Sequence, residues 1–195
     1  MSDVDRQHAE AERRFSEAVL AKTGDSILTE TLRGHEPIKE WTHVPEDDAF
    51  DPDSGAQWFY HCHPREGAAE ELTEHGHFHC FLRPEGRDGP IHHLIALSVD
   101  AYGRPLQFFT VNQWVVGDDW LPAEETIQLL PRFDAHLAQP GYLVNRWLTA
   151  MIRLHEDQIA ELIRARDAVL DEQQGDEDPR ERRTLEVLSV LPLEG

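Results

Sequence analysis

The chain has 195 residues, with 18 Lys and Arg against 38 Asp and Glu, so its formal net charge at neutral pH is −20. A chain this acidic repels phosphate backbones and anionic lipid headgroups, which argues against nucleic acids and membrane surfaces as partners. The apolar runs are short, such as residues 94–97, and the first residues lack the basic start and apolar stretch of a secretory signal. With only two cysteines, Cys62 and Cys80, a disulfide scaffold is excluded and a cytoplasmic location is expected.

The hydrophobic content of 39% is sufficient for a core, and residues 1–195 are expected to form one domain. The N-terminal segment, residues 1–35, is predicted to be helical. Apolar residues recur at helical spacing over residues 3–22, Gly24 provides a stop, and a second short helix is expected at 26–33. Residues 43–55 contain two prolines and five acidic residues, which predicts an exposed loop.

Residues 56–117 change from helical to alternating periodicity and are predicted to form a histidine-rich sheet. Four strands are expected, at 57–63, 75–83, 91–100 and 106–116. Their short connections favour an antiparallel meander. One of these connections, residues 64–73, is rich in Ala and Glu and is expected to contain a helical turn.

Helical periodicity returns over residues 122–172, where a short helix at 124–130 and a long helix at about 144–172 are predicted. A charged, flexible loop at 173–183 and a last strand at 184–192 complete the chain. The predicted fold class is therefore α+β. An antiparallel meander of four to five strands carries N-terminal helices, and the long C-terminal helix packs on one face.

The strongest functional signal is the concentration of histidines. Seven of the 12 lie among the 33 residues from His61 to His93, where an even distribution would place about two. Alternate side chains of a strand point to the same face. The pattern therefore predicts two co-facial sets on neighbouring strands, His61 and His63 on one and His75, His77 and His79 on the other.

Neighbouring antiparallel strands lie ~5 Å apart, so the two sets of imidazoles are expected to converge. Neutral imidazole is a ligand for iron, zinc, copper, manganese and nickel. A bound transition metal ion would also offset the cost of burying several unpaired imidazoles. The predicted metal ligands are His61, His63, His75, His77 and His79. The alternative is that these histidines are polar residues on a solvated sheet face.

The other histidines are less informative. His92 and His93 are adjacent and point to opposite faces, so at most one is expected to join the cluster. His155 lies in the apolar stripe of the long helix, where a hydrogen-bonded core residue is the commoner explanation and a position above the cluster is the alternative. His8, His35, His43 and His136 are expected to be ordinary surface residues. Glu74 is expected on the face opposite the cluster.

The hypothesis for function is a metal-dependent enzyme, of oxygenase or hydrolase type, acting on a small molecule. The first alternative is a non-catalytic metal- or haem-binding protein for storage, delivery or sensing. The second is a metal-free module that binds a small molecule and whose histidines titrate near neutral pH. The sequence carries no glycine-rich phosphate loop, nucleophile elbow or Cys-x-x-Cys pair that would favour another chemistry.

Overall fold

The computed structural model describes residues 2–35, 37–63 and 74–193 and has an α+β fold. Its six-stranded antiparallel sheet has the order β1-β2-β3-β4-β5-β6, so every strand pairs with its neighbour in the sequence. The strands are β1 (Val44–Phe50), β2 (Ala56–His61), β3 (Glu74–Leu82), β4 (His92–Asp100), β5 (Pro105–Val111) and β6 (Val187–Pro192). The predicted meander is confirmed, with one strand more than the four to five expected.

The N-terminal helices are also confirmed. Helix α1 begins at a capping box, in which the Ser2 side chain accepts from the Asp5 backbone N–H and the Asp5 side chain accepts from the Ser2 N–H. The helices are α1 (Asp3–Ala21), α2 (Ile27–Leu32), α3 (Gln113–Val116), α4 (Ala123–Leu129), α5 (Tyr142–Leu154) and α6 (Glu156–Asp171), with short 3₁₀ turns at Leu130–Arg132 and Pro179–Glu181.

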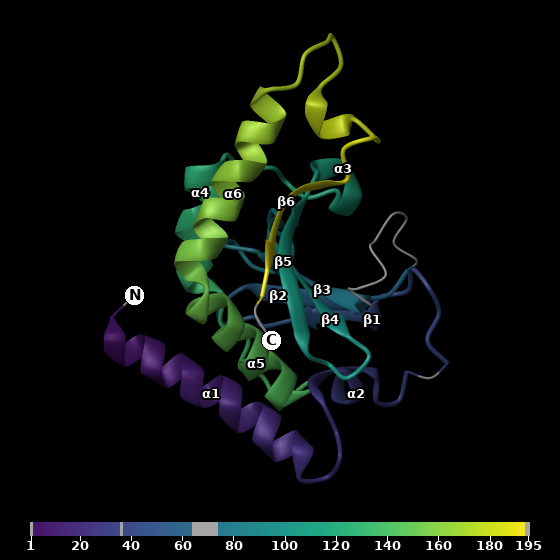
Figure 1. Ribbon diagram of the computed structural model, residues 1–195, viewed down its shortest axis with the longest axis vertical. Helices are drawn as coiled ribbons and strands as arrows, with labels where there is room; N and C mark the ends of the chain where they lie inside the picture. Colours follow the sequence, from purple (N-terminus) through teal and green to yellow (C-terminus); the bar gives the residue numbers. More distant parts are fainter. Residues whose placement is uncertain (1, 36, 64–73, 194–195) are drawn as a thin grey trace.

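Helices cover one face of the sheet and form the main core with it (Figure 1). Phe78 of β3 is buried there between Trp58 of β2 and Trp147 of α5. The Trp58 Nε1–H donates to Asn145 Oδ1 at 2.7 Å, which fixes α5 to β2. Helix α1 lies against α5, where Trp147 Nε1–H donates to Glu17 Oε1 at 3.0 Å.

The opposite face of the sheet carries the histidines and a second, smaller apolar cluster. Ala96 of β4 and Phe109 and Val111 of β5 are buried in that cluster, against Val115 and Val116 of α3. The strand alternation thus separates an apolar, helix-covered face from a face on which aromatic and imidazole rings lie side by side.

Two strand predictions need correction. Residues 43–55, predicted as a loop, contain β1, which forms one edge of the sheet. An edge strand tolerates Pro45 and exposed acids, and a register shift between Val44 and Ala49 obscures the alternation. The strand predicted at 106–116 ends at Val111, because the Asn112 side chain caps α3 by accepting from the Gln113 N–H.

The long C-terminal helix is two helices. His155, at φ −109° and ψ 15°, leaves the helical range between α5 and α6. The sequence contains neither Gly nor Pro at this break, so the helical periodicity continues across it. The last strand is confirmed as β6, whereas the helical turn expected within 64–73 lies outside the described residues.

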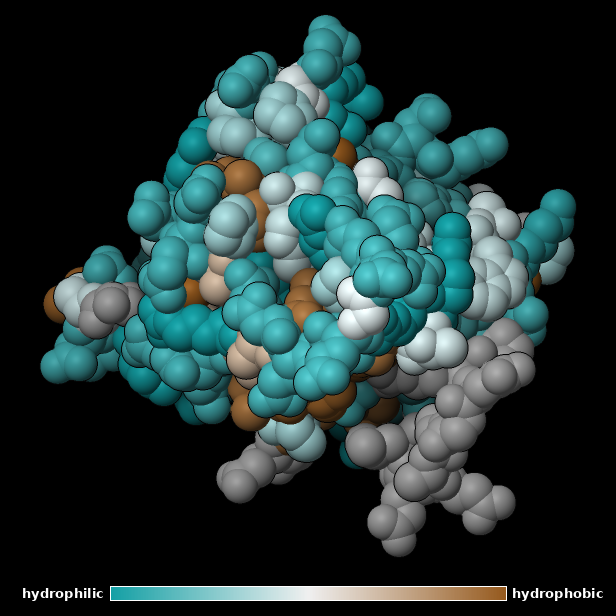
Figure 2. Space-filling view, turned by 90° about the horizontal axis from the view of Figure 1, so that it is seen from above, coloured by the Kyte–Doolittle hydropathy of each residue, from teal (hydrophilic) through white to brown (hydrophobic). Residues whose placement is uncertain are grey.

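Hydrophilic side chains dominate the molecular surface seen in Figure 2, with apolar side chains in small groups between them. This agrees with the high content of acidic residues. Within the described ranges, no helix is both long enough and apolar enough to cross a membrane.

Candidate metal centre

Strands β2 and β3 bring His61 and His77 together. In their antiparallel register Phe59 lies opposite His79, and His61 lies directly opposite His77. Directly opposed residues point to the same face with short separations between their side chains. The Nε2 atoms of His61 and His77 consequently lie 2.7 Å apart.

His63, two residues beyond His61, completes a group of three imidazoles. One ring nitrogen from each of His61, His63 and His77 lies within 4.8 Å of the others. Ligand nitrogens bound at ~2 Å to one zinc ion are at most ~4 Å apart. The upper limit of 4.8 Å in this group is therefore close to the separation that a shared ion would require.

Glu74 contacts the second ring nitrogen of His77. Its Oε1 lies 2.5 Å from His77 Nδ1, and both side chains are largely buried. A carboxylate here accepts the Nδ1 proton of a neutral imidazole, which leaves the lone pair on Nε2, the nitrogen that points toward His61. The expectation that Glu74 lies on the opposite face is wrong, because a register shift between Glu74 and Gly76 turns Glu74 toward the histidines.

The same register shift separates His75 from the group. The His75 Nδ1 lies 2.6 Å from the hydroxyl oxygen of Tyr60, whose ring is buried in the core on the helix-covered face. His75 was predicted to share a face with His77 and His79 through strict alternation. Alternation fails at the bulge, where one extra residue reverses the face to which the chain points.

His79 and His93 form a deeper pair beside the three imidazoles. His79 Nδ1 lies 3.1 Å from His93 Nε2, and both side chains are buried. His93 reaches this face because a register shift after Cys80 sets it opposite Phe81. His92 does not join the pair, since its Nδ1–H donates to the carbonyl oxygen of Asp119. This agrees with the expectation that only one of the two adjacent histidines contributes.

Burial keeps the imidazoles of His61, His79 and His93 neutral. Desolvation, followed by the neighbouring His77 and His63, lowers the pKa of His61 to about 2. Desolvation also lowers the pKa of His93 to about 3, with Arg166 as the next cause, and holds the pKa of His79 well below its ordinary value. A neutral imidazole is the form that binds metal ions, so this environment prepares the ring nitrogens for coordination.

Two aromatic stacks flank the three imidazoles on the side of β1. The Trp41 indole stacks on the His63 ring with 3.9 Å between centroids and 8° between planes. The His43 ring stacks on Phe59 with 3.6 Å between centroids, and its Nδ1–H donates to Asp48 Oδ1 at 2.8 Å. His43 was expected to be an ordinary surface residue. Its place beside the cluster depends on the pairing of β1 with β2, which the sequence did not indicate.

A second group of potential ligands, formed by Asp51, Asp53 and His136, has a structural explanation. Asp51 Oδ1 accepts hydrogen bonds from the backbone N–H groups of Asp53 and Ser54, and Asp51 Oδ2 accepts from the His136 N–H. These bonds hold the β1–β2 turn and attach it to the segment that leads into α5. The carboxylate of Asp51 is therefore already used in the fold.

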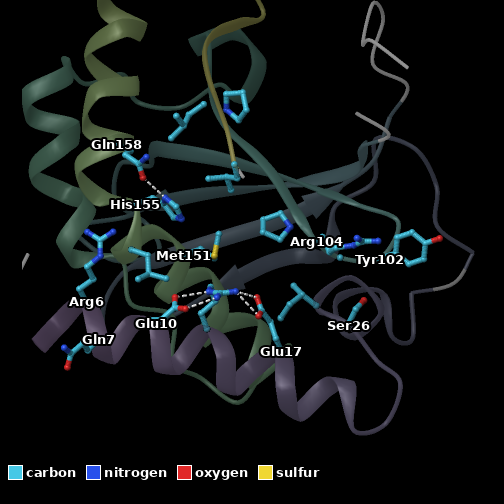
Figure 3. A pocket seen from close by; sticks show the side chains of 18 of the residues that line it. Arg6, Gln7, Glu10, Glu17, Ser26, Tyr102, Arg104, Met151, His155 and Gln158 are labelled. Carbon is cyan, nitrogen blue, oxygen red and sulfur yellow. Dashed lines mark hydrogen bonds and ion pairs between the residues drawn. The ribbon is translucent and has the colours of Figure 1, made fainter. Parts of the chain in front are cut away.

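A large groove lies far from the histidine cluster, between α1, the break between α5 and α6, and the ends of β5 and β6 (Figure 3). Its volume is about 1290 Å³. His155 lines it, with Nδ1 2.7 Å from Gln158 Oε1 and its ring against Phe108. His155 thus lies on the helix-covered side of the sheet, and the alternative that it covers the cluster is wrong.

Comparison with known proteins gives the chain a family. No curated protein and no solved structure matches the sequence. One family model, described as "Domain of unknown function (DUF6969)", matches residues 7–193, which is nearly the whole chain. The chain therefore belongs to the DUF6969 family.

Proposed function

We propose that this protein binds one transition metal ion through His61, His63 and His77, and that the ion is the centre of an enzyme acting on a small molecule. The observation that carries the proposal is the arrangement around His77. Glu74 contacts its Nδ1 at 2.5 Å, while its Nε2 lies 2.7 Å from the Nε2 of His61. Carboxylate–histidine pairs of this kind orient the imidazole ligands of metal ions in many proteins.

The donor set fits a transition metal ion. Burial lowers the pKa of His61 to about 2 and holds the pKa of His79 well below its ordinary value, so these two rings are neutral imidazoles at neutral pH. Without an ion, the two facing Nε2 atoms need one proton between them. A cation shared by both nitrogens removes that requirement and adds His63 as a third ligand.

Three protein ligands leave a coordination position for water or substrate. An ion held in this way would polarise a substrate oxygen or lower the pKa of a bound water molecule. In the proposed enzyme, Glu74 accepts a hydrogen bond from His77 Nδ1–H. This bond keeps the proton on Nδ1 and fixes the orientation of the ring. Phe59 and Phe109, whose rings lie beside the histidines, exclude water from the buried side of the site.

The test is metal content and metal uptake. Protein purified without a chelator or a polyhistidine tag is expected to contain, or to take up, about one metal ion per chain by elemental analysis. His77→Ala is expected to abolish this binding, whereas His8→Ala is the matched control, because His8 is an exposed histidine of α1. No stoichiometric uptake of zinc, iron, copper, manganese or nickel by the unaltered protein would refute the proposal.

A second candidate, a non-catalytic metal-binding protein, is favoured by the position of His79. Its ring centroid lies 4.9 Å from that of His77 and 5.2 Å from that of His61, so a change in its side-chain orientation would be needed to supply a fourth ligand. X-ray absorption spectroscopy of the loaded protein separates the two candidates. Three nitrogen ligands with an exchangeable oxygen support the enzyme, and four nitrogen ligands without one support storage, delivery or sensing.

A further inference from the structure

Trp41 occupies an unusual position beside the candidate metal centre. It lies in the connection between α2 and β1, its side chain is 63% exposed, and its backbone has a φ of 66°. Non-glycine residues rarely adopt this left-handed conformation, and for a bulky aromatic residue it is a genuine outlier. Such conformations persist where the surrounding structure enforces them, and they concentrate at ligand-binding sites.

The contacts of Trp41 show what holds it there. Its backbone N–H donates to the carbonyl oxygen of Cys62 at 3.0 Å, which anchors it beside the residue that separates His61 from His63. Its indole stacks on His63 and meets the His61 ring edge-on, with centroids 6.2 Å apart. The backbone is therefore fixed so that an aromatic ring lies against two of the three candidate ligands.

Hydrophobic burial does not account for this arrangement. The indole of Trp41 remains mostly in contact with solvent, because the smaller imidazole of His63 covers only part of it. His61 and His63 are the partly exposed members of the group, whereas His77 is buried, so the centre is approached from the side on which Trp41 lies. On that side the indole of Trp41 leaves aromatic surface open to solvent.

We infer that Trp41 is a stacking surface for the ligand of this site, and that the ligand combines a planar, aromatic ring with a group that coordinates the metal ion. This rests on the proposed metal centre and specifies the class of molecule that it receives. Stacking against an indole favours flat π systems over aliphatic chains of similar polarity. The further rings of His43 and Phe59, stacked on each other beside His61, extend the aromatic surface around the centre.

The test compares two probes that share a metal-binding group. Benzohydroxamate carries a phenyl ring, and acetohydroxamate carries a methyl group in its place. Their dissociation constants are measured on the metal-loaded protein. The ratio of the two constants is expected to favour benzohydroxamate, and Trp41→Gly is expected to reduce that preference about fivefold. Glycine adopts the left-handed backbone conformation freely, so this variant removes the ring without adding strain.

Two further variants complete the experiment. Trp41→Phe keeps an aromatic ring and is expected to retain most of the preference. Tyr102→Ala removes an aromatic residue of similar exposure, 71% exposed in the β4–β5 turn, and is expected to leave the preference unchanged.

The outcomes distinguish this inference from the proposed function. If Trp41→Gly binds the metal ion and keeps the full preference for benzohydroxamate, the stacking surface is refuted and the metal centre stands. If Trp41→Gly loses the metal ion itself, the indole supports His63 rather than a ligand, which also overturns the inference. If the unaltered protein binds no metal ion, the proposed function fails, and the inference fails with it.

Discussion

At the scale of single residues, His77 is the point on which the candidate site depends. It contacts Glu74 through one ring nitrogen and faces His61 through the other, while its ring packs against Phe109. A histidine with both nitrogens engaged in this way has one tautomer and one orientation. Its neighbours in the strand, Gly76 and Phe78, have no comparable polar role.

Glu74→Gln is expected to weaken metal binding by about 10- to 100-fold while leaving the protein folded, because the amide retains the size of the carboxylate but not its charge. Competition with a chromogenic chelator measures the affinity. Glu46→Gln is the matched control, since Glu46 is an exposed acid of β1. Equal affinities in the Glu74 variant and the unaltered protein would show that the carboxylate does not orient His77.

His93 makes folding stability depend on pH. Its pKa is lowered to about 3 by burial in the folded protein and is near 6.5 in the unfolded chain. Below pH 6.5 the unfolded chain takes up a proton that the folded protein does not accept. The free energy of unfolding is therefore fully retained above about pH 6.5. It is expected to fall as the pH decreases toward 3, by up to ~1.4 kcal/mol per pH unit for this residue.

Urea unfolding of the metal-free protein between pH 4 and 8 measures this dependence. In His93→Gln the free energy of unfolding is expected to fall less steeply with decreasing pH, because unfolding takes up about one proton fewer. The variant is also less stable at every pH, because it loses the pairing of His93 with His79. His8→Gln, an exposed control, is expected to follow the unaltered protein. Parallel curves for His93→Gln and the unaltered protein would contradict a depressed pKa at this position.

At the scale of elements, strand β3 contributes to the hydrophobic core with one face and to the histidine cluster with the other. Phe78 is fully buried on the helix-covered face, with its ring against Trp58, Tyr60 and Trp147. His77, one residue earlier, lies on the other face with the imidazoles. Gly76 permits the close approach that this register needs, because a Cβ atom there would lie 2.2 Å from the Tyr60 hydroxyl oxygen.

Phe78→Ala is expected to reduce the free energy of unfolding by about 3–5 kcal/mol, because it leaves a cavity in the core, while the folded fraction still binds the metal ion. His77→Ala is expected to have the reverse effect, with metal binding lost and the fold retained. Denaturant unfolding and metal titration of both variants check the contrast. Loss of metal from folded Phe78→Ala, together with normal binding by His77→Ala, would refute the assignment of the two faces.

At the scale of the whole molecule, a metal ion at this site would connect segments that are distant in the sequence. His61 ends β2, His63 follows it, and His77 lies in β3 beyond the stretch 64–73, so only the folded sheet brings His61 and His77 into register. A ligand that binds the folded state alone stabilises it by mass action. At a free metal concentration 100-fold above the dissociation constant, this contribution is about 2.7 kcal/mol.

The midpoint of thermal unfolding is therefore expected to rise on addition of the tightest-binding metal ion, by several degrees for a chain of this length. Calorimetry with and without the ion provides the measurement. His77→Ala serves as the control and is expected to show no metal-dependent shift. An unchanged midpoint for the unaltered protein at saturating metal would argue that the three imidazoles are not a site.

The sequence by itself determined the α+β class, the N-terminal helices, the antiparallel order of β2 to β5, and the placing of His61 and His77 on one face of the sheet. These follow from local periodicity, since alternation fixes which side chains share a face and short connections fix which strands are neighbours. Sequence periodicity also placed His63 and His79 on the correct face. It did not reveal the break at His155, because no helix-breaking residue marks it.

Tertiary structure alone decided the composition of the candidate site. Two register shifts, at Glu74/Gly76 and at Cys80/Phe81, remove His75 from the cluster and bring in Glu74 and His93. A bulge is a property of two paired strands and leaves no periodic signal in either one, yet it reverses the face of every residue on one side of it. The pairing of β1 likewise carries His43 and Trp41 to the cluster, since edge strands rich in charge resemble loops in sequence.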